Sequence, residues 1–332
     1  MNYRNYNDLI SVVWKNLEKI PEVDLVVGIP RSGMVPASII ALQLNKPLLT
    51  FGAYLNNEAP EIGERLSFNP SLANKKKRKV LIVDDSVNSG NELAKKRAIL
   101  EESNLVDELF FLCIYATPEN KDLPDFYFEV VEIPRIFQWN IFNHYYLSKS
   151  CLDMDGVLCL DPVEEENDDG ENYRKFCLNA KPLFIPKSPI GHIVTSRLEK
   201  YRKETESWLK AQGVKYDRLH MMHYNTAEER RKDNKHAEYK AAIFLETEAV
   251  LFIESDRRQG QIIHKLTDKP VFCTGTMEFY PDHRVKSSAK KPAYLSRRAK
   301  IKFMILRLGN IFKKIARRVN NLPGRNKVEF DT

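Results

Sequence analysis

Short apolar runs that end at a turn or at acidic residues recur along most of this chain, and segments with helical periodicity lie between them. The runs lie at 24–30, 80–83, 109–115, 150–152, 190–194 and 250–253, and the helical segments at 38–44, 92–100, 198–212 and 234–245. Strands that alternate with helices predict parallel α/β sheets. A chain of 332 residues is long enough for two such domains, and we place the boundary between them near residues 145–150.

Basic charge is concentrated at the C-terminal end of the sequence. Residues 285–332 hold fourteen Lys and Arg against two acids, so the net charge of +7 becomes about −5 over residues 1–284. We therefore expect three parts, a domain at 1–147, a second domain at 148–284 and a basic tail at 285–332. Neither domain is expected to be generally basic.

The sequence carries no pattern typical of export or of a membrane span. It has no run of eighteen or more apolar residues, and its first twenty residues are polar with a helical pattern, unlike a secretion signal. The five cysteines are odd in number and show no paired spacing. We expect reduced thiols and a cytoplasmic protein.

A predicted strand at 80–83 is followed by two carboxylates, Asp84 and Asp85, and then by a turn that contains a glycine. Open α/β sheets bind ligands at the carboxyl ends of their strands. A turn at 86–91 that leads into a helix exposes backbone N–H groups, which suit a phosphate. Carboxylates beside such a turn can hold sugar hydroxyls or Mg²⁺, so the pattern predicts a site for a phosphorylated sugar.

This segment resembles the signature of the type I phosphoribosyltransferases, which implies phosphoribosyl pyrophosphate (PRPP) as donor and Mg²⁺ as cofactor. Asp84 and Asp85 would contact the ribose hydroxyls. The loop around the 5-phosphate would consist of Ser86, Val87, Asn88, Ser89, Gly90 and Asn91. The segment GIPRSG at 28–33 would hold the diphosphate through Arg31, Ser32 and Gly33. Residues 52–75 would close over the site, with Arg65 as a contact.

The sequence departs from that family's pattern within the phosphate loop. Family members usually carry Thr where this chain has Asn88 and Asn91, and often at the position of Glu92. An acid that faces a phosphate is unfavourable, so we expect Glu92 to point away from the site or to pair with a base.

A second predicted strand, at 150–152, leads into Asp153 and Asp155, which stand two residues apart before a glycine. Carboxylates so placed can share Mg²⁺, and one can attack phosphorus while the other transfers a proton. The segment resembles motif I of the haloacid dehalogenase superfamily of phosphatases. The resemblance implies that Asp153 is the nucleophile and Asp155 the acid/base.

The other motifs of that superfamily follow in order. Thr195 or Ser196, at the end of a strand, would bind the phosphoryl group, and Lys240 would offset its charge, with Lys235 as the competing choice. The Mg²⁺ ligands would come from Asp153, Asp155, Glu254 and Asp256. Only about thirty-five residues separate the first two motifs, too few for a large cap, so the site would admit a phosphate on a bulky molecule. The acidic run among them is expected to be a solvated loop.

The basic tail has an amphipathic pattern between residues 300 and 319. Its apolar residues recur at spacings of three and four, at Ile301, Met304, Leu308, Ile311, Ile315 and Val319. An apolar face with a cationic surround favours the interface of an anionic membrane. Docking on the protein itself or on a dimer partner is the second interpretation, and a nucleic-acid arm the third.

Two smaller patterns carry weaker predictions. His220 and His223 have the spacing of metal ligands, but no further ligand type stands near them in the sequence, so we expect the surface of a loop or helix. The aromatic run at 137–144 would form a hood over the first site or a seam between domains, with Trp139 and Phe142 packed in a core.

Together the two sites predict a two-step enzyme. The first would transfer 5-phosphoribosyl from PRPP to an acceptor, and the second would remove the phosphate to leave ribofuranose. The pairing resembles bifunctional modules of bacterial surface-polysaccharide assembly, which implies a lipid-linked glycan acceptor and a peripheral position on the cytoplasmic face of the inner membrane. The alternative is nucleobase salvage coupled to a 5′-nucleotidase. A homo-oligomer is compatible with either interpretation.

Overall fold

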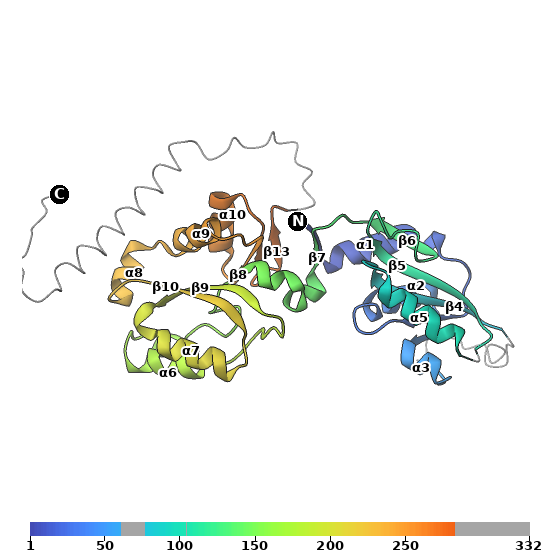
Figure 1. The fold of residues 1–332 in the computed structure, drawn as a ribbon, viewed down its shortest axis with the longest axis horizontal. Helices are drawn as coiled ribbons and strands as arrows, with labels where there is room; N and C mark the ends of the chain where they lie inside the picture. The colour runs from blue at the N-terminus through green and yellow to red at the C-terminus, as the bar shows by residue number, and fades with distance from the viewer. Residues whose placement is uncertain (61–76, 104, 283–332) are drawn as a thin grey trace, which may run out of the picture. The chain divides into compact units, whose positions relative to one another are not determined.

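Two larger β-sheets organise the part of the chain that the structure describes, residues 1–60, 77–103 and 105–282 (Figure 1). The structure is a computed structural model. A third, two-stranded sheet pairs β1 (Asn2–Arg4) with β7 (Arg135–Phe137). The described residues belong to one compact unit.

The first sheet is wholly parallel and has the order β3-β2-β4-β5-β6. Its strands are β2 (Leu25–Gly28), β3 (Leu48–Thr50), β4 (Lys79–Ser86), β5 (Glu108–Ala116) and β6 (Phe126–Val130). One face packs on α1 (Tyr6–Asn16) and α2 (Met34–Leu44), and the other packs on α3 (Phe51–Leu55) and α5 (Asn91–Glu101). The predicted parallel α/β architecture is confirmed for this part of the chain.

The second sheet has the order β10-β9-β8-β11-β12-β13, in which the last strand alone is antiparallel to its neighbour. Its strands are β8 (Ser150–Leu152), β9 (Ile190–Leu198), β10 (Tyr216–Met222), β11 (Leu251–Glu254), β12 (Val271–Cys273) and β13 (Glu278–Tyr280). The helices α6 (Glu171–Asn179) and α7 (Arg202–Ala211) pack on one face, and α9 (His236–Glu246) and α10 (Arg257–Thr267) on the other.

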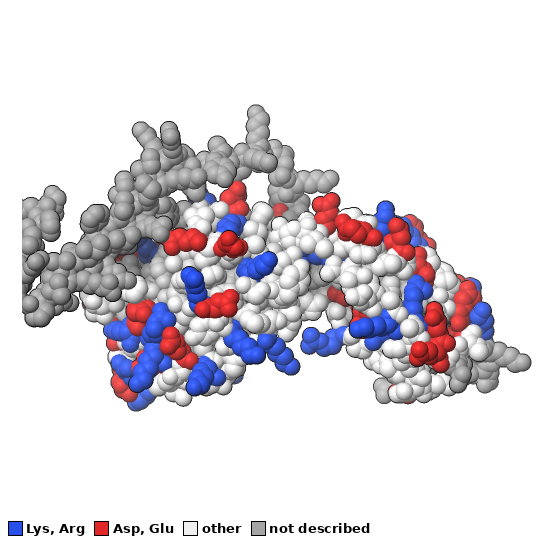
Figure 2. Space-filling model, viewed as in Figure 1, with Lys and Arg blue, Asp and Glu red and all other residues white. Residues whose placement is uncertain are grey.

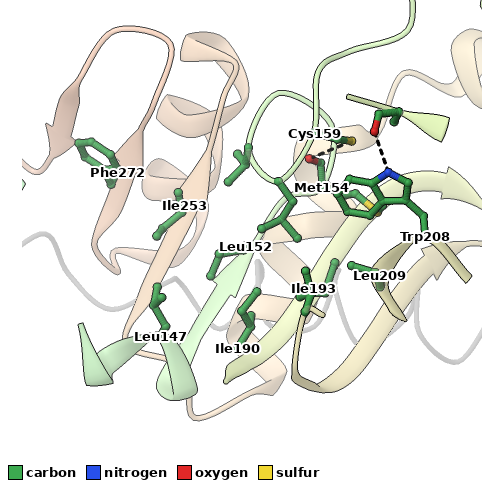
Figure 3. Close-up of a cluster of buried hydrophobic side chains, with 14 of the residues drawn as sticks. Leu147, Leu152, Met154, Cys159, Ile190, Ile193, Trp208, Leu209, Ile253 and Phe272 are labelled. Carbon is green, nitrogen blue, oxygen red and sulfur yellow. Dashed lines mark hydrogen bonds between the residues drawn. The ribbon is translucent and has the colours of Figure 1, made fainter. Parts of the chain in front are cut away.

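Aliphatic side chains of β8, β9 and β11 meet α7 in the larger of the two cores of this sheet. Leu152, Ile193 and Ile253 are buried there in the same cluster as Trp208 (Figure 3). The indole Nε1 of Trp208 donates to the carbonyl oxygen of Ala180 at 2.7 Å, so the ring is buried with its polar atom satisfied.

In each large sheet there is one place where the chain leaves two adjacent strands toward opposite edges of the sheet. In the first sheet β2 lies between β3 and β4, and in the second β8 lies between β9 and β11. Ligands of open α/β sheets bind outside the carboxyl ends of the strands at such switch points. Gly28 and Asp84 lie at the first of these places, and Asp153 and Glu254 at the second.

The segment between the two sheets contributes to the second core. It contains β7 and the short 3₁₀ helices η2 (Gln138–Asn143) and η3 (Tyr145–Lys149). Ile136 and Leu147 are buried with the residues of the second sheet, and so is Tyr3 of β1. The ring of Tyr3 stacks on Phe279 with centroids 4.5 Å apart. Residues from the N-terminal end of the chain thus help to form the core of the second sheet.

Three local predictions were wrong. The helix expected from 198 begins at Arg202, because β9 continues through Leu198 and the short helix η5 (Glu199–Tyr201) follows. His220 lies within strand β10 rather than on a loop or helix, and its ring contacts His192 of the neighbouring strand.

The third wrong prediction concerns the acidic run, which is largely exposed as expected but forms a structured segment instead of a loop. It forms η4 (Glu164–Glu166) and the start of α6. Asp168 accepts hydrogen bonds from the backbone N–H groups of Gly170 and Tyr173, both at 2.9 Å, and so caps that helix. Asp169 pairs with Lys200 and accepts from the N–H of Ala227. Carboxylates in this segment therefore fix local structure.

Two predictions fall on residues outside the described part of the chain. These are the basic tail at 285–332 and most of the expected closing segment, including Arg65. No helix among the described residues is long and apolar enough to cross a membrane. Figure 2 shows acidic and basic side chains interspersed on the described surface of the face in view.

Candidate functional sites

The GIPRSG segment and the two acids of the first site meet at the carboxyl ends of β2 and β4. Gly28 is the register partner of Val83, and the N–H of Ile29 donates to the Val83 carbonyl at 2.9 Å. A side chain on Gly33 would come within 2.7 Å of that same carbonyl and 2.9 Å of Asp84 Oδ1. The close approach of the two segments therefore requires glycine at position 33.

Asp85 is buried, and both of its carboxylate oxygens accept hydrogen bonds from other segments. Ser32 Oγ donates to Oδ1 at 2.9 Å, and the indole Nε1 of Trp139 donates to Oδ2 at 2.7 Å. The Trp139 ring stacks in turn on Phe137, with centroids 5.0 Å apart and planes 2° from parallel. Asp85 thus joins the GIPRSG loop to the aromatic run that was predicted to form a hood.

Asp84 has a different environment. Burial, and then the negative charge of Asp85, raise the pKa of Asp84 to about 8. Among the described residues, neither Asp84 nor Asp85 forms an ion pair with a lysine or arginine. A ligand that brings positive charge or hydroxyl donors to Asp84 would offset this repulsion.

The loop after β4 is fixed at three points. The N–H of Val87 donates to the Tyr115 carbonyl at 2.9 Å, and Arg135 Nη2 donates to the Val87 carbonyl at 2.7 Å. The amide of Asn120 donates to the Asn88 carbonyl. Gly90 has φ +79° and starts helix α5. The loop is therefore held by its flanks while residues 88–91 lead into a helix N-terminus, the arrangement expected of an anion site.

Glu92 lies on the first turn of α5 and pairs with Lys96 at 3.2 Å, with its side chain 61% exposed. The expectation that Glu92 pairs with a base is confirmed. Arg31 is exposed at the turn after β2.

In the second sheet, a buried lysine lies between two buried carboxylates. Lys240 Nζ is 2.6 Å from Asp153 Oδ2 and 2.7 Å from Glu254 Oε2, and it also donates to Gln259 Oε1 at 3.0 Å. Burial alone would lower the pKa of Lys240, but the charges of Asp153 and Glu254 raise it above its ordinary value. Lys235, the competing candidate, pairs with Asp233 and is 53% exposed.

The second acid of this site pairs with an arginine from the neighbouring strand. Arg197 Nη2 donates to Asp155 Oδ1 at 2.6 Å, and its Nε contacts both carboxylate oxygens at 3.1 Å. Arg197 is fully buried, and Asp155 is 18% exposed, so the ion pair is largely shielded from water. Strand β9 continues beyond the hydroxyl residues through Leu198, and Arg197 lies on this continuation.

The remaining predicted residues surround these pairs. Thr195 is buried and its Oγ1 accepts from the N–H of Arg197 at 3.1 Å, whereas the Oγ of Ser196 is buried without a hydrogen-bond partner in the described part of the chain. Asp256 caps α10 by accepting from the N–H of Gln259 at 2.7 Å.

Carboxylate oxygens are the donors that Mg²⁺ prefers, and Asp153, Asp155 and Glu254 supply them here. Within the described ranges, however, no three His, Cys, Asp or Glu side chains stand together as a metal-binding group. Lys240 lies between Asp153 and Glu254, and Arg197 pairs with Asp155. The donor chemistry fits Mg²⁺, and in the described arrangement each of these carboxylates contacts a cationic side chain.

Sequence reasoning missed Arg197 and Arg135, and it gave Trp139 only a packing role. Arg197 directly follows the predicted Thr195 and Ser196. Residues two apart on a strand point to the same face, so the sequence could have indicated that Arg197 shares a face with Thr195. Arg135 and Trp139 contact the first site across 48 and 54 residues of sequence, and local patterns carry no information on such contacts.

Comparison with known proteins assigns the first part of the chain. Residues 5–149 match the family model described as the phosphoribosyl transferase domain. An orotate phosphoribosyltransferase from Staphylothermus marinus is 29% identical over 109 residues, which are 32% of this chain and 50% of that protein. The chain thus spans about half the length of the curated relative that it matches.

Solved structures similar to the chain include two further phosphoribosyltransferases. A purine phosphoribosyltransferase from Pyrococcus horikoshii Ot3 is 23% identical with a TM-score of 0.31, and the match covers 42% of this chain and 92% of that one. The Helicobacter pylori xanthine-guanine-hypoxanthine phosphoribosyltransferase is 16% identical with the same TM-score and coverages. From the family match, a phosphoribosyl transferase domain spans residues 5–149 of this chain.

Proposed function

We propose that this chain transfers a 5-phosphoribosyl group from PRPP to a glycan acceptor, with release of pyrophosphate, and then hydrolyses the 5-phosphate to leave ribofuranose. The first step is assigned to the phosphoribosyl transferase domain, and the second to a haloacid dehalogenase-like phosphatase domain at 148–284. The observation that carries the proposal is the buried Asp153–Lys240–Glu254 group at the switch point of a second sheet, outside the transferase domain.

In the transfer step, the residues at the carboxyl ends of β2 and β4 orient the donor. The N–H groups of residues 88–91 suit the 5-phosphate, and Arg31 with the Ser32–Gly33 backbone suits the diphosphate. Asp84 is assigned to accept a hydrogen bond from a ribose hydroxyl. Bound Mg²⁺ would neutralise charge on the departing diphosphate. These residues act by holding the donor so that the anomeric carbon faces the acceptor.

In the hydrolysis step, Asp153 is the nucleophile. Its Oδ2 lies against Lys240, which holds the carboxylate in place and balances its charge. Asp153 attacks phosphorus as the bond from phosphorus to the sugar oxygen breaks, and Asp155, in its protonated form, gives its proton to that leaving oxygen. The Asp155 carboxylate, held by Arg197, then takes a proton from the water that hydrolyses the aspartyl-phosphate. Thr195 and Ser196 lie within the adjacent strand β9 and are assigned to the phosphoryl oxygens.

The proposal is tested by incubating the full chain and its Asp153→Asn variant with PRPP, Mg²⁺ and candidate glycans, and weighing the products. The wild type should give the ribosylated acceptor without phosphate. The variant should transfer normally and accumulate the phosphorylated adduct, which is heavier by one phosphate group. Fully dephosphorylated product from the variant would refute the assignment of Asp153.

A second candidate function is nucleobase salvage followed by nucleotide dephosphorylation. The similarity of residues in the transferase domain to an orotate phosphoribosyltransferase favours it. The same incubation therefore includes orotate and purine bases. A nucleoside product would support this alternative, and a ribosylated glycan would exclude it as the main reaction.

The basic tail is proposed to bind an anionic membrane surface on which a lipid-linked acceptor lies. The support is the regular spacing of its apolar residues among fourteen basic residues at 285–332. Deletion from Val285 onward should move the protein from the membrane fraction to the supernatant. Equal fractionation of the two forms would remove the membrane proposal and leave the two catalytic assignments untouched.

A further inference from the structure

Three buried polar atoms without hydrogen-bond partners lie around the second site. They are Ser196 Oγ, Arg230 Nε and His236 Nδ1, and none of them has a partner among the described residues. Leaving a buried polar atom unpaired is unfavourable, so proteins seldom do so without a functional reason. All three groups can donate a hydrogen bond to an anion.

Arg230 lies on α8 (Ala227–Asp233), which follows β10 and is visible next to that strand in Figure 1. Its Nη1 donates to the Ser196 carbonyl at 2.7 Å, which brings the guanidinium to the segment of β9 where Thr195 and Ser196 are found. Arg197, the next residue along this strand, pairs with Asp155.

His236 connects this group to the lysine. It begins helix α9, one turn before Lys240. Burial, and then the charges of Arg230 and Lys240, lower the pKa of His236 to about 4. The imidazole is thus neutral at physiological pH, when it has one N–H to donate.

The cations of the site differ in how their charge is balanced. Lys240 is paired with Asp153 and Glu254, and Arg197 is paired with Asp155. Arg230 forms no ion pair among the described residues. A phosphomonoester dianion that enters the site needs positive charge beyond what the carboxylates already use, and Arg230 can supply it.

We propose that Arg230, Ser196 and His236 form an oxyanion subsite that binds the phosphoryl oxygens of the sugar phosphate at the second site. The proposal rests on the proposed phosphatase function and extends it by assigning two residues outside the motifs found in the sequence. Arg230 supplies the charge-assisted bond, and Ser196 and His236 supply neutral donors.

The test compares two adjacent arginines of the same short helix. Arg231 bonds through Nε to the Ala227 carbonyl and is exposed, so Arg231→Gln is a matched control for Arg230→Gln. Binding of inorganic phosphate to the full chain is measured by calorimetry for both variants. The phosphate loop of the transferase domain is identical in the two, so its contribution cancels in the comparison.

We expect Arg230→Gln to bind phosphate at least tenfold more weakly than Arg231→Gln, and Arg230→Lys to recover part of the loss. His236→Phe should weaken binding several-fold, whereas His236→Gln, which keeps a donor, should weaken it less. Equal phosphate affinity in Arg230→Gln and Arg231→Gln, with both variants folded by circular dichroism, would overturn the proposal. A phosphate affinity that depends on Arg230, in a protein that hydrolyses no phosphomonoester, would instead contradict the proposed function alone.

Discussion

The two candidate sites both place paired carboxylates at the switch point of an α/β sheet, but they hold those carboxylates in opposite ways. Asp85 is held by neutral donors, Ser32 and Trp139, at 2.9 and 2.7 Å. Asp153 and Asp155 are held by the cations Lys240 and Arg197, at 2.6 Å in each case. Asp84 and Asp85 therefore have no cationic partner among the described residues, whereas Asp153, Asp155 and Glu254 each contact a buried cation, with Lys240 shared between two of them.

This difference has a chemical consequence. A site with spare negative charge favours a ligand that carries hydroxyl donors and a divalent cation, as PRPP with Mg²⁺ does. A site whose carboxylates are already paired keeps a nucleophile in a fixed position and favours an anionic substrate through its cations. The comparison thus supports assigning donor binding to the first sheet and phosphate removal to the second.

The largest effect is expected from removing the cation of the second site. Lys240→Met leaves Asp153 and Glu254 buried and facing each other without a counter-charge. Breaking a buried ion pair from one side costs about 3–5 kcal/mol, which should appear as a large fall in the urea midpoint and as loss of dephosphorylation. Lys235→Met is the control, because Lys235 is exposed.

Lys235→Met should keep both the urea midpoint and the dephosphorylation of the wild type. If the two variants lost activity equally with unchanged stability, the assignment of Lys240 as the cation that holds Asp153 and Glu254 would be wrong.

The choice between these lysines shows what the sequence could and could not predict. The buried residues of α9 are Ala237, Lys240, Ala241 and Phe244. Residues at these spacings of three, one and three lie on one face of a helix, which here is the buried face. This face can be identified from the sequence once the first residue of the helix is known. The helix was predicted to start at 234 and starts at 236, so the sequence alone left Lys235 open.

The strands of both sheets were predicted well where they are continuous aliphatic runs. Val80–Val83 and Ser150–Leu152 lie within or coincide with strands of the structure. Strand β10 and helix α8 were missed, because sequences such as YDRLHMM mix charged and apolar residues without a clear period. These elements are fixed by packing on the sheet, which a local pattern does not report. Helix α10 was missed although its buried residues Gly260, Ile263 and Thr267 have the spacing of one helix face.

Contacts that cross between segments were the least predictable part of the sites. The strand ends with Asp84, Asp85, Asp153 and Glu254 followed from the rule that parallel sheets bind at their carboxyl edge. The partners of these acids did not, since Trp139 and Arg197 lie 54 and 42 residues away from them. Which polar side chain meets which carboxylate depends on the tertiary packing of segments that the sequence lists separately.

An intermediate effect is expected at the first site from removing one neutral donor. Trp139→Phe keeps a ring to stack on Phe137 but removes the N–H that bonds Asp85. A hydrogen bond to a charged group contributes about 1.5–3 kcal/mol, so we expect the KM for PRPP to rise about tenfold as Asp85 and the Ser32 loop lose their fixed position.

Trp208→Phe is a matched control for this substitution. It removes an indole hydrogen bond of equal length, 2.7 Å, from the core of the second sheet. It should lower the melting temperature and leave the KM for PRPP unchanged. A rise in that KM of the same size in both variants would mean that Trp139 acts only through general stability.

The smallest effect, about 1 kcal/mol between pH 7 and pH 9, is expected from the pH dependence of stability at the first site. Burial and the charge of Asp85 raise the pKa of Asp84 to about 8, whereas an unfolded aspartate titrates near 4. The folded chain therefore binds one more proton at this pair than the unfolded chain between these values. The stabilisation of the folded chain by this extra proton is fully present below pH 4 and is lost as the pH rises through 8.

Asp84→Asn cannot lose that proton, so its melting temperature relative to the wild type should rise between pH 7 and pH 9, measured without PRPP or Mg²⁺. Between pH 5 and pH 6 the wild-type pair is still protonated in the folded chain, and the gain from the variant should be smaller. The second site should behave differently. Asp155→Asn removes the partner of buried Arg197, so it should lower the melting temperature both at pH 5 and at pH 9. If Asp84→Asn showed no gain at pH 9, the negative charge of the first site would already be compensated, and the distinction between the two sites would fail.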